Sequence, residues 1–280
     1  MAKIKSIAKA IVPPVIISAI RILRAPGKAK SIFSGNYSSW AEAKKQCSGY
    51  ESEMILEKCK NALLKVKNGE AVYERDSVIF DEIEYSWGLL AGLQKAALDN
   101  DGKLTVLDFG GSLGSSYFQN KGFLNGLHQL QWCIVEQAHF VETGRDNFEN
   151  NQIKFYYTIE ECLDRHKPNV LLLSGVLQYL SDPYKWVQQF ISLKMPYIII
   201  DRTAFIDHEK DILTVQNIPS EIYEARYPAW FFDFKRFLQL FKGYTMLAQF
   251  NAHEGYIIEL ENGLKSTYKG IILQYDRKFA

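Results

Sequence analysis

A glycine-rich turn after an apolar run is the strongest sign of chemistry in this chain. The stretch KLTVLDFGGSLGSSYF, residues 103–118, stops its apolar run at Asp108 and then places Gly110, Gly111 and Gly114 before a predicted helix. Glycine lets a backbone bend sharply and approach a ligand without a clash from Cβ. The helix that follows offers N–H groups and a positive dipole end to an anionic group. The spacing therefore predicts a ligand site at the end of a β-strand.

Two common phosphate-binding patterns do not fit this turn. A dinucleotide-binding turn reads G-x-G-x-x-G and a phosphate loop reads G-x-x-x-x-G-K-S/T, and residues 110–114 match neither. What remains is a strand followed by Asp-x-Gly-x-x-x-Gly. Its carboxylate suits an ammonium group, and its helix end suits a carboxylate. S-adenosylmethionine carries both groups on one amino-acid tail, so the turn predicts this molecule as the cofactor.

An acid at the end of the next predicted strand supports this interpretation. The run WCIVEQ places Glu136 at its carboxyl end. In dinucleotide enzymes, an acid at the corresponding place accepts hydrogen bonds from the two hydroxyls of a ribose. Glu136 alone is a weak signal, but it gains weight from the glycine turn one strand earlier.

The elements that must position these residues alternate along the chain. From residue 104 onward, short β-rich runs are separated by stretches long enough for crossover helices, which predicts a mostly parallel, doubly wound α/β sheet of the Rossmann-like class. Two later runs, 244–251 and 268–275, are joined directly and predict an antiparallel terminal hairpin. The candidate parallel strands are 104–109, 131–136, 153–157, 169–174 and 196–201.

The residues before this sheet are expected to form an N-terminal helical cap. Ser39-x-x-Glu42 is a capping box that opens one helix, and two more helices are expected over 52–67 and 79–98. The expected organisation is therefore a basic amphipathic segment at 1–30, a helical cap at 31–102 and a Rossmann-like domain at 103–280.

Residues 104–205 resemble the class I S-adenosylmethionine-dependent methyltransferases. In that family the turn after the first strand cradles the methionine moiety, and the acid ending the second strand binds the ribose. The stretch LLLSGVLQYLSDP, residues 171–183, matches the pattern after the family's fourth strand, with Gln178 in place of a histidine. After the third strand the family often has an acid for the adenine amine, where this chain has Thr158. The cofactor-binding residues that the resemblance implies are Asp108, Gly110, Gly111, Gly114, Glu136, Gln137, Thr158, Ser174, Gly175 and Gln178.

A narrower resemblance runs from about Phe33 to the C-terminus. The stretches FSGNYSSWAEAKKQCSGYESEMILEK, YERDS, IIIDRTAF and YPAWFF are similar to a family of inferred methyltransferases encoded among bacterial surface-polysaccharide genes, those for O-antigen and capsule. This resemblance implies O-methylation of a sugar, in a glycan that is free, nucleotide-linked or lipid-linked. It also implies a protein of the cytoplasm, either free or at the inner face of the membrane.

Methyl transfer to a hydroxyl benefits from a base within hydrogen-bond reach. Asp201 and Arg202 end the fifth predicted strand, where they are a candidate base and a cation that orients the acceptor. The alternative is a local ion pair. His253, in a polar connection, is a second candidate base, although a lone loop histidine is more often solvated.

Aromatic and charged residues elsewhere are candidates for binding the acceptor. Tyr227 and Trp230 lie in an aromatic turn before a predicted helix at 233–241, and their rings suit stacking on a sugar. Packing in the core is the alternative for these two. Arg75, in YERDS, lies in the cap, where it either helps a lid cover the donor or forms a structural ion pair.

The charge of the chain is uneven. Lys and Arg together exceed Asp and Glu by one, yet the residues before Glu42 contain seven basic side chains and no acid. Such a basic head does not predict a nucleic-acid-binding surface over the whole protein. The apolar run AIVPPVIISAIRIL is too short to span a bilayer. Residues 1–24 either contact an anionic membrane surface or form a helix that packs on protein, on this chain or a twin subunit; the oligomeric state stays open.

The cysteines indicate neither a metal site nor a disulfide framework. The four of them are scattered without a C-x-x-C pair, which fits a reducing cytoplasm. Two rival functions remain beside the methyltransferase. One is a non-catalytic scaffold of a polysaccharide assembly complex, and the other is a nucleotide-sugar-modifying enzyme with the same fold.

Overall fold

The chain consists of two compact units. The computed structural model describes residues 32–47, 52–75, 77–218, 225–252 and 257–276. The larger unit is built from the described parts of 85–211, 231–255 and 267–280. The smaller unit is built from the described parts of 1–84, 212–230 and 256–266. This division differs from the expected cap at 31–102 and domain at 103–280, because two later segments join the smaller unit and residues 85–102 join the larger one.

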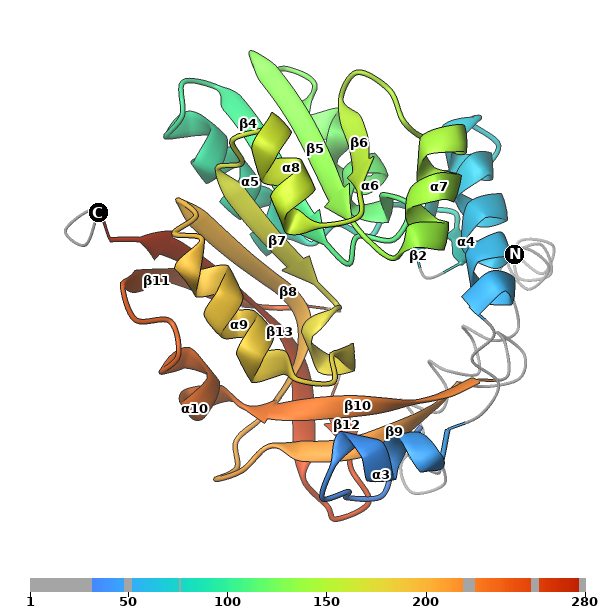
Figure 1. Cartoon of the computed structure of the whole chain (residues 1–280), viewed down its shortest axis with the longest axis vertical. Helices are drawn as coiled ribbons and strands as arrows, with labels where there is room; N and C mark the ends of the chain where they lie inside the picture. Colours follow the sequence, from blue (N-terminus) through green and yellow to red (C-terminus); the bar gives the residue numbers. More distant parts are fainter. Residues whose placement is uncertain (1–31, 48–51, 76, 219–224, 253–256, 277–280) are drawn as a thin grey trace, which may run out of the picture. The chain divides into compact units, whose positions relative to one another are not determined.

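The larger unit contains a mostly parallel sheet, as the sequence predicts (Figure 1). Its strand order is β11-β13-β8-β7-β4-β5-β6. The four neighbouring pairs from β8 to β6 are parallel, and β11 pairs with β13 in the antiparallel direction. The fold class, a Rossmann-like sheet with an antiparallel terminal hairpin, is therefore confirmed. The strands are β4 (Lys103–Phe109), β5 (Gln129–Val135), β6 (Ile153–Tyr156), β7 (Val170–Ser174), β8 (Tyr197–Ile206), β11 (Tyr244–Asn251) and β13 (Lys265–Tyr275).

Helices cover both faces of this sheet, as expected for parallel strands that are mostly apolar and buried. All five residues of β7 are buried, for example. In Figure 1, α8 and α9 lie in front of the sheet, and α5 and α6 lie behind it. Asp182 caps α9 and Pro183 opens it, as expected of a proline at a first helical position. The helices are α5 (Trp87–Leu98), α6 (Ser115–Leu124), α7 (Ala138–Asn147), α8 (Ile159–Arg165), α9 (Pro183–Ser192) and α10 (Phe234–Leu238).

The smaller unit contains helices and short strands. The expected N-cap is present at the start of α3 (Trp40–Lys45), where Ser39 Oγ accepts from Glu42 N. The Glu42 carboxylate accepts from the N–H of Ser38 and not from that of Ser39, so only half of the predicted capping box is formed. Helix α4 (Ser52–Lys67) agrees with the predicted 52–67. The strands are β1 (Phe33–Ser34), β2 (Tyr73–Arg75), β3 (Val78–Phe80), β9 (Ile212–Ile218), β12 (Ile257–Glu259) and most of β10 (Ala225–Asp233), whose last three residues belong to the larger unit.

Two predictions about these elements were wrong. The expected helix over 79–98 begins only at Trp87, because Val78–Phe80 pairs with β2 in a hairpin that favours β-branched and aromatic residues. The region around Tyr227 and Trp230 is a strand, β10, and not a turn. The helix expected at 233–241 is shorter, spanning Phe234–Leu238 with Asp233 as its cap.

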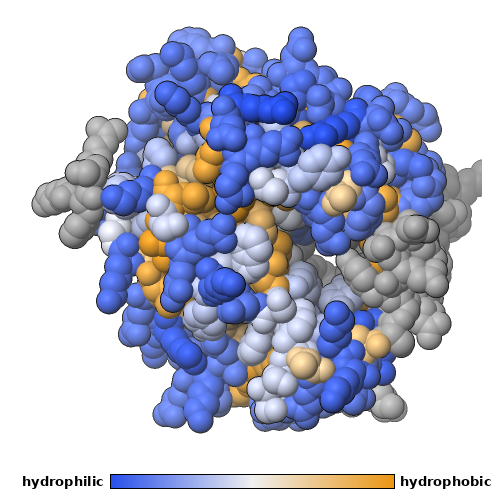
Figure 2. All heavy atoms as spheres, in the orientation of Figure 1, coloured by the Kyte–Doolittle hydropathy of each residue, from blue (hydrophilic) through white to orange (hydrophobic). Residues whose placement is uncertain are grey.

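Hydrophilic residues cover most of the face shown in Figure 2, and hydrophobic residues form narrow strips between them. None of the described helices is long and apolar enough to cross a membrane. Residues 1–24, which carry the expected membrane contact, lie outside the described residues, so that contact stays a prediction.

A buried carboxylate lies near the carboxyl end of the central strand. Asp108, on β4, is 1% exposed. It pairs with Ile134 of β5, so Trp132, two residues earlier on β5, lies on the same face of the sheet. Trp132 Nε1 donates a hydrogen bond of 2.9 Å to Asp108 Oδ2. The register of two parallel strands thus positions this carboxylate.

Trp132→Phe tests how much this hydrogen bond stabilises the fold. The substitution keeps a buried ring and removes the N–H donor, so we expect the free energy of unfolding to fall by about 1.5–3 kcal/mol. Urea denaturation measures it. Trp186→Phe is the matched control, because no hydrogen bond of the Trp186 ring to a described residue is present, and it should cost clearly less. Equal losses in the two variants would contradict the assigned role of the N–H.

Candidate functional site

The turn after β4 has an alternating backbone. Gly110, Ser112 and Gly114 have φ angles of 71°, 53° and 104°, all in the left-handed region. A Cβ at position 110 would lie 2.4 Å from Val176, in the loop after β7, and one at position 114 would lie 2.6 Å from Ile153. Both glycines are therefore required by their backbone and by close neighbours. The turn of β4 is in contact with the loop of the adjacent strand β7.

Asp108 lies directly beneath this turn. A Cβ at Gly111 would come within 2.6 Å of the Asp108 carboxyl carbon, so only glycine leaves room for the carboxylate. Gly114 is the N-cap of α6, and its N–H donates to the carbonyl of Gly111. The predicted combination of a strand-end acid, a glycine turn and a helix N-terminus is therefore present in the structure.

Glu136 is joined to the same turn from one strand over. Its carboxylate accepts hydrogen bonds from the backbone N–H groups of Gln137, at 2.7 Å, and of Ser112. Burial raises the pKa of Glu136 above its ordinary value, and the two N–H donors oppose that rise. Gln137 follows it and is exposed. Two residues predicted to hold the same cofactor, Asp108 and Glu136, are thus both in contact with residues 111–112.

A second cluster lies at the carboxyl end of β7 and in the middle of β8, because β8 continues to Ile206 and does not end at Asp201 and Arg202 as predicted. Asp201 is 1% exposed and accepts hydrogen bonds of 3.1 Å from the hydroxyls of Ser174 and Ser86. Arg202 Nε donates to Ser174 Oγ at 3.2 Å and lies 3.9 Å from Asp201 Oδ2. The structure therefore brings the predicted base and cation together with Ser174. Each oxygen of the Asp201 carboxylate therefore accepts a hydrogen bond from a serine hydroxyl.

The backbone around this cluster is unusual. Arg202 has a φ of 49°, which is uncommon for a residue with a side chain. Gly175, with a φ of 68°, donates its N–H to the carbonyl of Asp201, and its α-carbon faces the Arg202 guanidinium. Gln178 Nε2 donates to the carbonyl of Arg202 at 3.1 Å. Gln178 Oε1 is buried and has no hydrogen-bond partner among the described residues.

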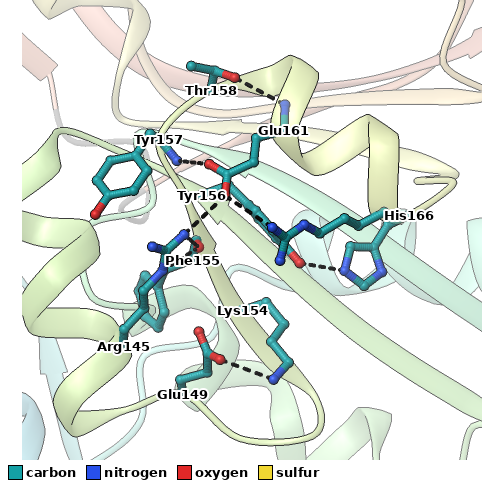
Figure 3. Close-up of polar contacts among 10 residues, drawn as sticks. Arg145, Glu149, Lys154, Phe155, Tyr156, Tyr157, Thr158, Glu161 and His166 are labelled. Carbon is teal, nitrogen blue, oxygen red and sulfur yellow. Dashed lines mark hydrogen bonds and ion pairs between the residues drawn. The ribbon is translucent and has the colours of Figure 1, made fainter.

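The segment after β6 contains Thr158, which the sequence predicts to contact the cofactor. Thr158 is the N-cap of α8, and its hydroxyl accepts from Glu161 N at 3.0 Å (Figure 3). Beside it, the ring of Tyr157 is 42% exposed, and the Arg145 guanidinium lies 4.6 Å from the ring centroid. Arg145 is in turn fixed by Glu161 and by the carbonyl of Phe155. The hydroxyl of Thr158 is thus engaged in the cap, and Tyr157 presents the accessible side chain.

Three residues predicted to bind the acceptor, Arg75, Tyr227 and Trp230, belong to the smaller unit. Arg75 Nε donates to the hydroxyl of Tyr73 at 2.8 Å, and Trp230 stacks on Trp40 with ring centroids 6.4 Å apart. His253 lies outside the described residues.

Two participating residues escaped the sequence interpretation. Ser112 adopts the left-handed conformation that a glycine would signal, and nothing in its residue type indicates this. Ser86 reads as the N-cap of α5, yet its hydroxyl caps nothing and donates to Asp201. Among the described residues, no group of His, Cys, Asp and Glu side chains is arranged to hold a metal ion. The site therefore offers backbone N–H groups, two buried acids and hydroxyl groups.

No protein-family model matches the sequence, and no curated protein matches it. Solved structures that are similar include the N-terminal domain of EvdMO1 with SAH bound, at 10% identity, which covers 73% of this chain and 90% of that one with a TM-score of 0.42. The CcbJ methyltransferase from Streptomyces caelestis is 13% identical; the match covers 68% of this chain and 89% of that one, with a TM-score of 0.43. The [4+2]-cyclase SpnF is 10% identical; the match covers 88% of this chain and 99% of that one, with a TM-score of 0.45. The roles of the site residues therefore rest on the geometry of this chain.

Proposed function

We propose that the larger unit binds S-adenosylmethionine and transfers its methyl group. The observation that carries this proposal is the turn after β4, which encloses Asp108 below and donates the Ser112 N–H to Glu136 beside it. In doubly wound sheets, ligands bind beyond the carboxyl ends of the strands, where the strand order reverses. Here that point lies between β4 and β7, whose loops touch at Gly110 and Val176.

The proposed roles follow from the charge of each group. The negative charge of Asp108 beneath Gly111 attracts the ammonium group of the cofactor's amino-acid tail. The N-terminus of α6 attracts its carboxylate. Glu136 accepts hydrogen bonds from the ribose hydroxyls, and Gln137 and Thr158 border the nucleoside. Ser174, Gly175 and Gln178 line the cofactor from the side of β7.

The chemical step is an in-line displacement at the methyl carbon. The carbon–sulfur bond breaks, its electron pair returns to sulfur, and an acceptor hydroxyl oxygen forms the new bond as its proton leaves. The protein mainly has to align the two molecules. Asp201 is the proposed base, and because it is buried, the proton reaches it through Ser174, whose hydroxyl lies 3.1 Å away. His253 remains an alternative base.

A sugar hydroxyl of a bacterial surface polysaccharide is the proposed acceptor. The support is the resemblance that runs from about residue 33 to the C-terminus. Arg202, at the cluster itself, is the proposed orienting cation. The proposed roles of Arg75, Tyr227 and Trp230 in holding the sugar remain predictions.

One observation favours a second candidate function, binding of the cofactor without catalysis. Asp201 is 1% exposed, and hydroxyl groups of this chain already occupy both of its oxygens. Incubating the protein with S-adenosylmethionine and purified O-antigen or capsule glycans distinguishes the two functions. For the methyltransferase we expect S-adenosylhomocysteine to form, and Asp201→Asn to lower its rate by roughly 100-fold or more, as for loss of a base. Cofactor binding with no S-adenosylhomocysteine formed would support the second candidate.

Calorimetry with S-adenosylmethionine tests the cofactor site directly. Asp108→Asn keeps an oxygen that can accept from the Trp132 N–H and removes the negative charge. Glu136→Gln likewise keeps an acceptor oxygen for the ribose hydroxyls and removes the negative charge. We expect each to weaken binding by roughly 10- to 100-fold, the value of one or two charge-assisted hydrogen bonds. Glu142→Gln, on the exposed side of α7, is the matched control and should bind as the parent does. Absent binding by the parent, or undiminished binding by both site variants, would refute the proposal.

The raised pKa of Glu136 gives the binding a pH dependence. The ribose hydroxyls donate to the carboxylate form, so affinity is complete well above the raised pKa and is lost as the pH falls through it. An ordinary glutamate titrates near about 4.3, so the loss begins at a higher pH than that. We expect the dissociation constant to rise as the pH is lowered through the raised pKa of Glu136, beginning above the ordinary titration range of a glutamate. Glutamine does not titrate, so in Glu136→Gln we expect the dissociation constant to change much less with pH. If the dissociation constant of this variant depends on pH as that of the parent does, Glu136 is not the source of the dependence.

A further inference from the structure

The smaller unit has a cavity of its own. Its volume is about 250 Å³, and three separate segments of the unit line it. Its floor is apolar, with Phe33, Ile212 and Leu260 all no more than 4% exposed. Its rim is polar and exposed. The lining residues of the rim and wall are Gly35, Asn36, Thr214, Glu261 and Asn262.

The rim is held in place by hydrogen bonds between its segments. The N–H of Gly35 donates to Glu261 Oε2 at 2.8 Å, which joins residues far apart in the sequence. Gly35 has a φ of 76°, and a Cβ there would lie 2.6 Å from the ring of Tyr37, so this N–H is presented by a backbone that requires glycine. Asn262 Oδ1 accepts from Leu264 N at 3.2 Å. The side chains of Glu261 and Asn262 are therefore positioned before any ligand arrives, which lowers the entropic cost of binding.

The polar groups of the rim suit a ligand rich in hydroxyls. The side-chain amide of Asn36 has no hydrogen-bond partner among the described residues, so it offers both donors and an acceptor. The Asn262 amide uses its oxygen within the turn and keeps its NH₂ group for a ligand. Glu261 binds Gly35 through one oxygen, which leaves the second as an acceptor. Hydroxyl groups both donate and accept, and they match this mixture of groups.

The charge and size of the cavity exclude other classes of ligand. No Lys or Arg lines it, and Glu261 adds a negative charge, so a phosphate or a nucleotide is disfavoured. Drug-sized ligands occupy about 300–1,000 Å³, so a cavity of this volume suits a single ring. The apolar floor suits the C–H face of such a ring.

We propose that this cavity of the smaller unit binds one uncharged monosaccharide ring, whose hydroxyls contact Asn36, Glu261 and Asn262. The proposal does not depend on methyl transfer, because every residue of the cavity belongs to the smaller unit and none belongs to the cluster at Asp108 and Glu136. This cavity is a second binding site of the protein, and it binds a glycan without modifying it.

Saturation-transfer NMR and calorimetry on the full chain test the proposal, without cofactor. The probes are the methyl glycosides of glucose, galactose, mannose, rhamnose and N-acetylglucosamine, with glucuronate as the charged comparison. We expect saturable binding of at least one neutral sugar and weaker binding of glucuronate, which Glu261 repels. Asn262→Asp keeps the acceptor for Leu264 N and removes the amide donors, so we expect it to weaken binding by about 3- to 10-fold.

Three variants keep the test specific. Glu261→Gln preserves an acceptor for the Gly35 N–H and should restore glucuronate to the affinity of the neutral sugar. Asn36→Ala, on the exposed rim, should weaken binding with an unchanged melting temperature. Glu259→Gln makes the same change outside the cavity and should bind as the parent does. Absence of saturable binding for every sugar, or binding that none of the cavity variants alters, would overturn the proposal; neither result bears on cofactor binding by the larger unit.

Discussion

The larger unit depends on one buried charge. Asp108 lies near the end of its central strand at 1% exposure, and a carboxylate removed from water costs several kcal/mol unless hydrogen bonds and charges compensate. Trp132 supplies one such bond from the neighbouring strand, and the absence of a side chain at Gly111 lets the turn close over the acid. The sheet register, the glycine and the acid therefore require one another.

The parallel core could be predicted because each of its strands is recognised from residues that are adjacent in the sequence. Each strand from β4 to β7 is a short, mostly apolar run, and Asp108 and Glu136 lie at or beside the carboxyl ends of β4 and β5. Strand ends on one side of a parallel sheet meet at one edge, so these acids could be assigned to a shared region before their contacts were known. The N-cap at Ser39 and the proline at 183 are local signals of the same kind, and both are present in the structure.

What the sequence did not reveal depends on distant partners or on backbone conformation. Strand β1 pairs with β9, for example Phe33 with Gln216, and no local pattern connects two segments that far apart. The aromatic segment at 227–230 was misread for the same reason, since its pairing decides that it is a strand. Ser112 and Arg202 have left-handed backbones without being glycine. Such strain is invisible in a residue type, although it marks places where the fold overrides local preference.

The contact between Gly110 and Val176 has a consequence for how this protein tolerates change. Because a Cβ at position 110 would lie 2.4 Å from the valine side chain, the loops after β4 and β7 share a boundary with no spare volume. A larger residue at 176 would press on the turn that covers Asp108, while a smaller one would leave a gap beside it. Because Gly110 also has a φ of 71°, a smaller residue at 176 does not make position 110 suitable for a side chain, so this boundary restricts position 176 to side chains of about the size of valine.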